Sequence, residues 1–255
     1  MRRDEGRSGR RVSVTWRGNA FFEIASPAVR IAVDPWIRGN PGCSLDLRDF
    51  RPGRATHVFL THGHPGHWGR GDSADIAAAC AAPLYAPEPL AEYIRRTRGA
   101  GVAVREVGDG WTMHGDVFDA TYRVCPHPEA PALSSEDAVV PCEPNGFYRF
   151  ALGETTVIHV GDCVPDPVFR ELAAECPRID LACLPLWGAG MAVSREDALR
   201  RFLEVVDMLR PARVMCHNRF DPERRAWNAV RDIFTREFPR VVLLPQRLDE
   251  PEVLP

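Results

Sequence analysis

The sequence lacks any apolar run close to the roughly 20 residues that a helix needs to cross a bilayer. Its first eleven residues, MRRDEGRSGRR, also lack the apolar segment that a secretory signal peptide requires. No large excess of one charge is present, since the formal net charge is −3. These absences predict a cytoplasmic protein that binds neither membrane nor nucleic acid, and the charge balance favours a small-molecule substrate.

Interdomain linkers and low-complexity tracts are also missing, which bears on domain organisation. The chain has 255 residues, of which 45% are hydrophobic, so it can bury a sizeable core in one large domain or two small ones. We expect a single domain over 12–255, preceded by a flexible, solvated tail over 1–11. A monomer and a homo-oligomer are both compatible with this composition.

The eight cysteines form no C-x-x-C pair and no spacing typical of a disulfide framework. Several lie in apolar segments such as LACLPLW. We therefore expect reduced, mostly buried thiols and no disulfide scaffold. Cys125 and Cys216 lie near candidate metal ligands in the sequence, where a packing role is favoured over coordination.

Strand and helix signals alternate along the chain. Short β-branched and aromatic runs predict an antiparallel meander within 11–36 and a fourth strand over 55–62, which reaches His62. An alanine-rich helix over 72–82 follows, with Asp72 or Ser73 as its cap. The later helices are expected over 169–176, 194–210 and 221–238, and the later strands over 181–187, 212–217 and 241–246. This order predicts an α/β fold, an αββα sandwich in which two mixed β-sheets pack face to face with helices on both outer faces.

The segment FLTHGHPGHWGRGD places three histidines within six residues, although the whole chain has only eight. If the strand extends to its end at His62, then His62 and His64 project to the same side and two imidazoles can share one cation. Pro65 and Gly66 allow a sharp turn that carries His67 toward a neighbouring position. The alternative, three surface or turn histidines, is improbable for so rare a residue, so the segment predicts one metal site or two adjacent ones.

Further ligands must come from elsewhere in the chain. CPHP supplies His127 after one predicted strand, VIHVGDC supplies Asp162 after another, and RVMCHNRFD supplies His217 at the end of a third. Each of these residues, taken alone, is equally compatible with a structural role and with a role as a metal ligand. Together they place three ligand types at strand ends, where loops converge, and they favour zinc, with manganese or iron as alternatives.

With these motifs in place, the chain resembles the metallo-β-lactamase superfamily, whose hallmark is a T-H-x-H-x-D-H loop after a strand. It is most similar to the branch of sugar-phosphate lactonase-like and N-acyl-phosphatidylethanolamine phospholipase D-like hydrolases. WRGNAFFEIASPAVRIAVDPWIRGNP resembles that branch's opening strands with their D-P-W turn, and VIHVGDC resembles its Y-H-x-G-D-T segment. CLPLWGAGMAVSREDAL resembles its L-P-I-G-G segment, and VMCHNRFD its final I-P-x-H.

The resemblance implies a first metal ion with a second ion beside it. The implied ligands of the first ion are His62, His64 and His127, those of the second are His67 and His217, and Asp162 bridges the two. The chain departs from the family at Gly66, which replaces the motif aspartate, and at the turn Gly18-Asn19-Ala20, which replaces a GHS-like turn. The lost carboxylate should weaken a second ion, so one zinc is expected, with the second an open alternative.

The expected activity is that of a metallo-hydrolase with an altered second metal site. Zinc would activate a water for attack on an ester, lactone, thioester or phosphodiester, with Asp162 and His217 in catalytic roles. Two alternatives remain open: a mononuclear iron oxygenase or thiol-oxidising enzyme, and a catalytically degenerate binding protein. Candidate substrate-binding residues, each also explicable as packing or surface, are Trp36, Trp187, Asn218 and Arg219. Of the other histidines, His57 is expected in a strand, His114 in a turn and His159 in packing or behind the ligands.

Overall fold

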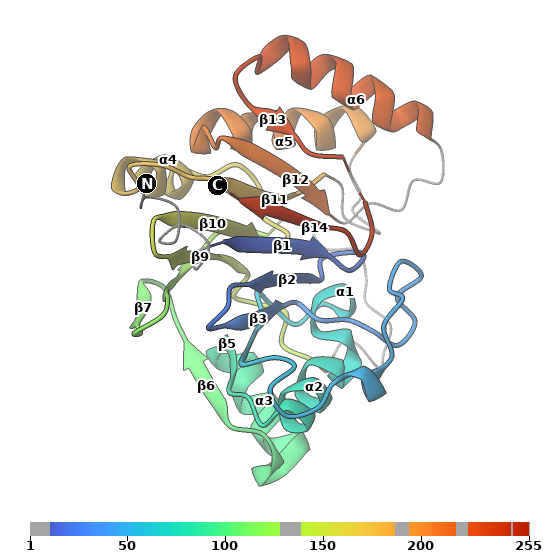
Figure 1. Cartoon of the computed structure of the whole chain (residues 1–255), viewed down its shortest axis with the longest axis vertical. Coiled ribbons are helices and arrows are strands. Elements are labelled where there is room, and N and C mark those ends of the chain that lie inside the picture. The colour runs from blue at the N-terminus through green and yellow to red at the C-terminus, as the bar shows by residue number, and fades with distance from the viewer. Residues whose placement is uncertain (1–10, 128–138, 187–193, 218–223, 246, 255) are drawn as a thin grey trace, which may run out of the picture.

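The computed structural model describes residues 11–127, 139–186, 194–217, 224–245 and 247–254. Within these ranges two seven-stranded sheets lie face to face, and helices cover their outer faces (Figure 1). This is the predicted αββα arrangement. Three of the predicted substrate-binding residues, Trp187, Asn218 and Arg219, lie outside the described ranges.

The first sheet joins the two ends of the described chain. Its order is β14 (Pro251–Leu254), β1 (Val12–Trp16), β2 (Phe22–Ala25), β3 (Arg30–Val33), β4 (His57–Phe59), β5 (Leu84–Pro87) and β6 (Val104–Val107). The pairs from β14 to β3 are antiparallel, as the predicted meander requires, and the pairs from β3 to β6 are parallel. The carboxyl ends of β3, β4 and β5 therefore meet at one edge.

The second sheet carries the later ligand candidates. Its order is β13 (Val242–Leu243), β12 (Arg213–His217), β11 (Leu181–Pro185), β10 (Thr155–Val160), β9 (Gly146–Leu152), β8 (Asp119–Val124) and β7 (Trp111–His114). Strands β10 to β13 run parallel, and β7 to β10 run antiparallel. The segments that follow β8 and β10, and the end of β12, consequently lie at the same edge.

Three apolar clusters hold these layers together. One lies between the sheets and contains buried rings such as Phe22, Phe59 and Phe150. A second lies outside the first sheet, beneath α2 (Asp72–Cys80) and α3 (Glu88–Arg98). The third lies outside the second sheet, beneath α4 (Val168–Glu175), α5 (Arg195–Leu209) and α6 (Arg224–Glu237). The short helices are α1 (Pro65–Trp68), η2 (Leu47–Asp49), η3 (Gly69–Gly71) and η4 (Gly99–Gly101).

Several predicted boundaries differ from the structure. Strand β4 ends at Phe59, three residues before His62, because tertiary contacts replace the sheet partners beyond it. Helix α2 is preceded by Gly71 at φ +109°, and Asp72 lies inside the helix, where its carboxylate accepts hydrogen bonds from the backbone of Ile37 and Arg38. His114 ends strand β7 instead of lying in a turn. The short strands β7 and β14 were not predicted, since edge strands carry weak sequence patterns.

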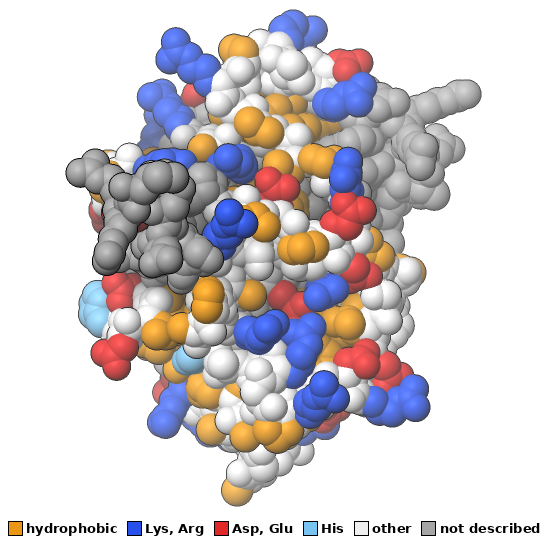
Figure 2. Space-filling view, in the orientation of Figure 1, with side chains coloured by type: hydrophobic (Ala, Val, Ile, Leu, Met, Phe, Trp, Pro, Cys, Tyr) orange, Lys and Arg blue, Asp and Glu red, His pale blue; other side chains and the backbone are white. Residues whose placement is uncertain are grey.

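The surface on the face viewed carries charges of both signs. Figure 2 shows acidic and basic side chains interspersed with apolar ones across this face. Among the described residues, no helix is long and apolar enough to span a membrane.

Candidate metal site

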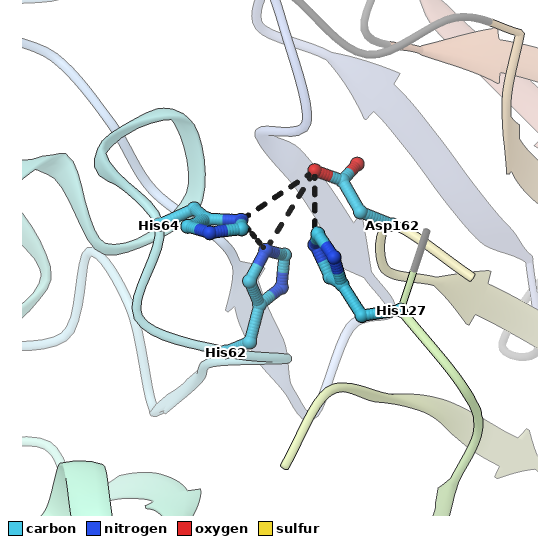
Figure 3. A group of neighbouring side chains, drawn as sticks. All are labelled: His62, His64, His127 and Asp162. Atoms are coloured by element: carbon cyan, nitrogen blue, oxygen red, sulfur yellow. Dashed lines mark hydrogen bonds and ion pairs between the residues drawn. The ribbon is translucent and has the colours of Figure 1, made fainter. Parts of the chain in front are cut away.

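Four side chains from three separate segments converge at the shared edge of the two sheets. His62 and His64 lie in the turn between β4 and α1, His127 follows β8, and Asp162 follows β10. One potential ligand atom from each lies within 4.8 Å of all the others. Asp162 Oδ2 lies 3.7 Å from His62 Nε2, 4.0 Å from His64 Nδ1 and 3.9 Å from His127 Nε2 (Figure 3).

This geometry and the protonation of the group both fit a metal ion. Ligands about 2.1 Å from a tetrahedral cation lie about 3.4 Å from one another, close to the spacing found here. Burial, reinforced by neighbouring histidines, lowers the pKa of His62 to about 3 and that of His64 to about 4. Although burial opposes it, the imidazoles of His67 and His62 hold the pKa of Asp162 well below its usual value. Asp162 thus presents a carboxylate to the neutral imidazoles of His62 and His64, and carboxylates and neutral imidazoles are donors that zinc and similar cations bind.

A fully buried carboxylate, Asp34, positions His62 through the residue before it. Its Oδ1 accepts a hydrogen bond from the Thr61 amide at 2.8 Å, and its Oδ2 accepts one from the Thr61 hydroxyl at 2.7 Å. Because that hydroxyl donates to Asp34, it accepts from His62 Nδ1, 3.0 Å away. His62 is thereby held in the tautomer whose Nε2 lone pair faces the site.

Asp34 also holds His67 and His159. Its Oδ2 accepts hydrogen bonds from His67 Nδ1 at 2.7 Å and from His159 Nε2 at 3.1 Å. His67 Nε2 lies 3.3 Å from Asp162 Oδ1, so His67 bridges the two carboxylates. Burial opposes its charge, but Asp162 and Asp34 outweigh burial and raise the pKa of His67 to about 10. His159 thus lies behind the ligands, one of the two roles predicted for it.

Asp34 was missed by the sequence reasoning, which treated it only as part of a D-P-W turn. Its position in the sequence could have identified it, because Asp34 is an acidic residue directly after an apolar strand. Asp162 was predicted as a ligand from the same kind of position. In the structure Asp34 has φ +49°, an unusual conformation for a non-glycine residue. Four polar groups converge on its carboxylate, which explains how this backbone strain is maintained.

His217 lies at the end of β12 and is fully buried. Its Nε2 donates a hydrogen bond to the Val160 carbonyl at 2.7 Å, so Nδ1 carries the lone pair. In the described part of the chain this buried Nδ1 has no hydrogen-bond partner. Burial lowers the pKa of His217 to about 3, and its ring centroid lies 6.4 Å from that of His67. His67 and His217 are therefore near the first site but are not part of its compact four-residue group.

Asn19 and Gly66, the positions at which the sequence was expected to depart from the family motif, lie next to each other in space. Asn19 Nδ2 donates a hydrogen bond to the Gly66 carbonyl at 2.7 Å, although 47 residues separate the two. A Cβ atom at Gly66 would lie 2.7 Å from the same Asn19 nitrogen, closer than side chains tolerate. Asn19 therefore occupies the space into which a side chain at position 66 would extend.

The cysteine prediction is wrong at two positions, because Cys125 and Cys163 form a disulfide. A separation of 38 residues hid this pairing from any local spacing rule. Cys216 packs in the apolar cluster outside the second sheet, as predicted. Trp36 lies in the turn after β3, partly exposed, with its Nε1 donating to the Arg38 carbonyl at 2.6 Å.

An open hollow lies beside Asp162. Its lining is mostly apolar and comes from the segment after β10, the end of β11 and one side of α5. Cys163, Leu184 and Phe202 contribute to this lining, as does the charged side chain of Arg201. The site therefore has an apolar surface beside its carboxylate.

The family model of the beta-lactamase superfamily domain matches residues 13–216. A UPF0173 metal-dependent hydrolase of Pyrobaculum islandicum is 30% identical over 221 residues, which cover 83% of this chain and 89% of that protein. The chain belongs to the metallo-β-lactamase superfamily. The recognised superfamily is thereby confirmed, and the predicted enzyme class is the one that its curated relatives carry in their names.

Two solved structures share this fold. The structure of Igni18, a metallo hydrolase from Ignicoccus hospitalis, matches with a TM-score of 0.72 at 21% identity, covering 95% of this chain and 98% of that one. CmlA, a diiron β-hydroxylase from Streptomyces venezuelae, matches with a TM-score of 0.67 at 17% identity, covering 95% of this chain and 54% of that one. At these identities the likeness shows the fold alone, and the fold accommodates both hydrolysis and oxidation.

Proposed function

We propose that this protein is a metal-dependent hydrolase in which His62, His64, His127 and Asp162 hold a divalent cation, zinc in the first instance. The observation that carries the proposal is the convergence of these four side chains, from three segments, within 4.8 Å. A cation bound there supplies a Lewis acid and lowers the pKa of a water toward about 7. The same proposal includes a single domain over 12–255.

The residues around the cation have separate tasks. Asp162 presents Oδ2 to the three imidazoles and Oδ1 to His67. It would therefore help to hold the cation and would orient a water beside it. His67, charged and fixed by Asp34, places positive charge next to Asp162 Oδ1. That charge stabilises negative charge as it develops on the substrate, a task that a second cation would otherwise perform.

An alternative within this proposal is that the site holds two cations instead of one. Its ligands would be His67, Asp162 and His217, whose buried Nδ1 lone pair has no hydrogen-bond partner among the described residues. Binding requires His67 Nε2 to lose its proton, against the two carboxylates that favour the charged form. Gly66 supplies no carboxylate that could offset this cost. We therefore propose that each chain binds one cation.

We propose an ester, lactone, thioester or phosphodiester as substrate, attacked at its carbonyl or phosphoryl centre. The apolar hollow beside Asp162 supports a substrate with an apolar portion. Arg201 in the lining of the hollow suits a negatively charged group next to that portion. Trp36, Trp187, Asn218 and Arg219 remain predicted substrate contacts, with His217 a predicted catalytic group.

An iron oxygenase or thiol-oxidising enzyme is the alternative with a specific basis. Histidines with one carboxylate and open coordination positions suit Fe(II) as well as zinc. Elemental analysis separates the two, because iron at one equivalent with oxygen uptake would replace the hydrolase proposal.

The decisive experiment compares the native protein with His64→Ala and with His114→Ala as a matched control. His114 lies on edge strand β7 with its side chain 79% exposed, so its loss leaves the site intact. We expect about one equivalent of zinc in the native and control proteins, with ester or phosphodiester hydrolysis, and loss of both in His64→Ala. A native protein that binds no transition metal ends the proposal. Metal binding without turnover on any of the four substrate classes favours a binding protein instead.

A further inference from the structure

The disulfide lies directly between two segments that carry proposed metal ligands. Cys125 is two residues before His127, and Cys163 immediately follows Asp162. The two cysteine Cα atoms are 5.9 Å apart, within the usual range for a disulfide. The covalent link therefore joins the backbone that positions His127 to the backbone that positions Asp162.

A buried asparagine ties the same segments together. Asn145 is fully buried, and its Nδ2 lies 3.2 Å from Cys163 Sγ and 3.8 Å from Cys125 Sγ. The Asn145 carbonyl accepts a hydrogen bond from the Cys125 amide at 3.1 Å. A Cβ atom at Gly161 would lie 2.6 Å from Asn145 Oδ1, so the chain before Asp162 packs tightly against this side chain. Asn145 thus contacts both sulfurs and also the chain next to each proposed ligand.

The two sulfurs differ in access. Cys163 is 8% exposed and lines the open hollow beside Asp162, whereas Cys125 is 1% exposed and lies in the core. Cys163 is therefore the cysteine of the pair that lies closer to solvent. Because exchange proceeds by attack on an accessible sulfur, Cys163 is the point of entry.

We propose that Cys125 and Cys163 form a reversible thiol–disulfide site that sets how firmly the cation is held. In the opening reaction, the thiolate of a low-molecular-weight thiol attacks Cys163 Sγ, breaks the Sγ–Sγ bond and releases Cys125 as a thiol after protonation. A second thiolate attacks the mixed disulfide and releases Cys163. Two thiols become one low-molecular-weight disulfide, two electrons and two protons pass to the protein, and the reverse reaction closes the pair.

The functional consequence rests on the metal site proposed above. When the pair is open, noncovalent contacts such as the Val164 amide donating to the Pro126 carbonyl at 3.1 Å still join the two segments. The freedom gained by His127 and Asp162 should weaken cation binding about 10-fold, which is the scale seen when groups that orient ligands are removed.

The test equilibrates the full chain with glutathione, either mostly reduced or mostly oxidised, and removes the glutathione before measurement. Intact mass and thiol counting report the pair, and zinc release to a chromophoric chelator reports the cation. The variants are Cys125→Ser/Cys163→Ser and, as control, Cys43→Ser, since Cys43 is half-buried and outside the disulfide. We expect the reduced native protein to gain two thiols and release zinc about 10-fold faster, with the same response in Cys43→Ser. The double variant should release zinc fast in both buffers.

The experiment can contradict the redox proposal and the metal-site proposal independently. If the native thiol count is the same in both buffers, the pair is not a reversible site, whatever the zinc result. If the thiols change but zinc release does not, the pair does not control the cation and the inference is overturned. If neither form binds zinc, the proposed function fails at the metal site, while the thiol count still decides the redox chemistry.

Discussion

Individual residues decide how many charges the site holds and where they lie. Asp34 collects hydrogen bonds from Thr61, His67 and His159 without belonging to the four-residue ligand group. Its charge and its position both matter, because Asp34 and Asp162 together outweigh burial and raise the pKa of His67 to about 10. Asp34 is thus a positioning residue for both His62 and His67.

Asp34→Asn should test this role. The amide oxygen keeps one acceptor, but the amide nitrogen faces donors, and the buried charge of His67 loses one of its two carboxylate partners. We expect the free energy of unfolding to fall by about 3 kcal/mol and zinc affinity to fall about 10-fold, measured by urea unfolding and chelator competition. Asp116→Asn, at an exposed position, should change neither. Unchanged zinc affinity in Asp34→Asn would show that Asp34 is structural only.

Gly66 and Asn19 form a second residue-scale test, since each restricts the other. Gly66→Asp alone should lose the Asn19 hydrogen bond and cost about 1 kcal/mol of stability without gaining a cation. Gly66→Asp combined with Asn19→Gly should bind a second equivalent, because glycine clears the space and tolerates φ +47° at position 19. Zinc stoichiometry measures the outcome, with Asn19→Gly alone as the control. A second equivalent in Gly66→Asp alone would contradict the steric argument.

At the scale of elements, the second sheet holds the histidine turn of the first. The Tyr148 hydroxyl on β9 donates a hydrogen bond to the Leu60 carbonyl at 3.0 Å, and the Tyr122 hydroxyl on β8 donates one to the Thr61 carbonyl at 3.1 Å. These bonds satisfy the backbone directly after β4 ends. The two sheets thereby fix the register at which His62 leaves the first sheet.

Tyr148→Phe should separate this tether from packing, because the ring remains and only the hydroxyl is lost. The Leu60 carbonyl loses its Tyr148 partner in a buried region, so we expect a loss of about 1 to 2 kcal/mol in stability. Zinc affinity should fall by a few fold as the turn loosens. Tyr93→Phe on α3 keeps the ring contact with Trp68 and serves as the control in urea unfolding and chelator competition. Equal zinc affinities in the two variants would contradict the tether.

Local patterns predicted the elements better than their ends. The alternation of strands and helices follows from period-two and helical patterns, which need no tertiary information. Strand β4 was predicted to reach His62 but ends at Phe59, because Asp34 and the two tyrosines compete for the backbone there. Such competitors lie far away in the sequence, so no local rule identifies them.

At the scale of the whole molecule, burial of several histidines makes stability depend on pH. Burial lowers the pKa of His62 and His217 to about 3 and that of His64 to about 4, against about 6.5 when unfolded. Unfolding of the metal-free protein therefore takes up protons below about pH 6.5. The contribution of His67 to stability depends on pH in the opposite direction. It is complete below about pH 6.5 and is lost as the pH rises toward the folded pKa of His67, about 10.

We expect the free energy of unfolding of metal-free protein to fall between pH 6.5 and pH 4, by about 1.4 kcal/mol per pH unit for each histidine involved. Urea unfolding at fixed ionic strength measures this slope. His62→Gln should reduce the slope by about one histidine, whereas exposed His114→Gln should leave it unchanged. A native slope of zero in this range would contradict neutral, buried imidazoles.

The sequence by itself determined the layered fold and the histidine-rich turn, because hydrophobic periodicity and motif spacing are local properties. It also identified His127, Asp162 and His217 as strand-end candidates. Only the tertiary structure decided that Asp34 stands behind His62 and His67, that Asn19 fills the space beside Gly66, and that Cys125 bonds to Cys163. Each of these is a contact between residues dozens of positions apart, and their proximity is set by how the two sheets pack, which no single segment encodes.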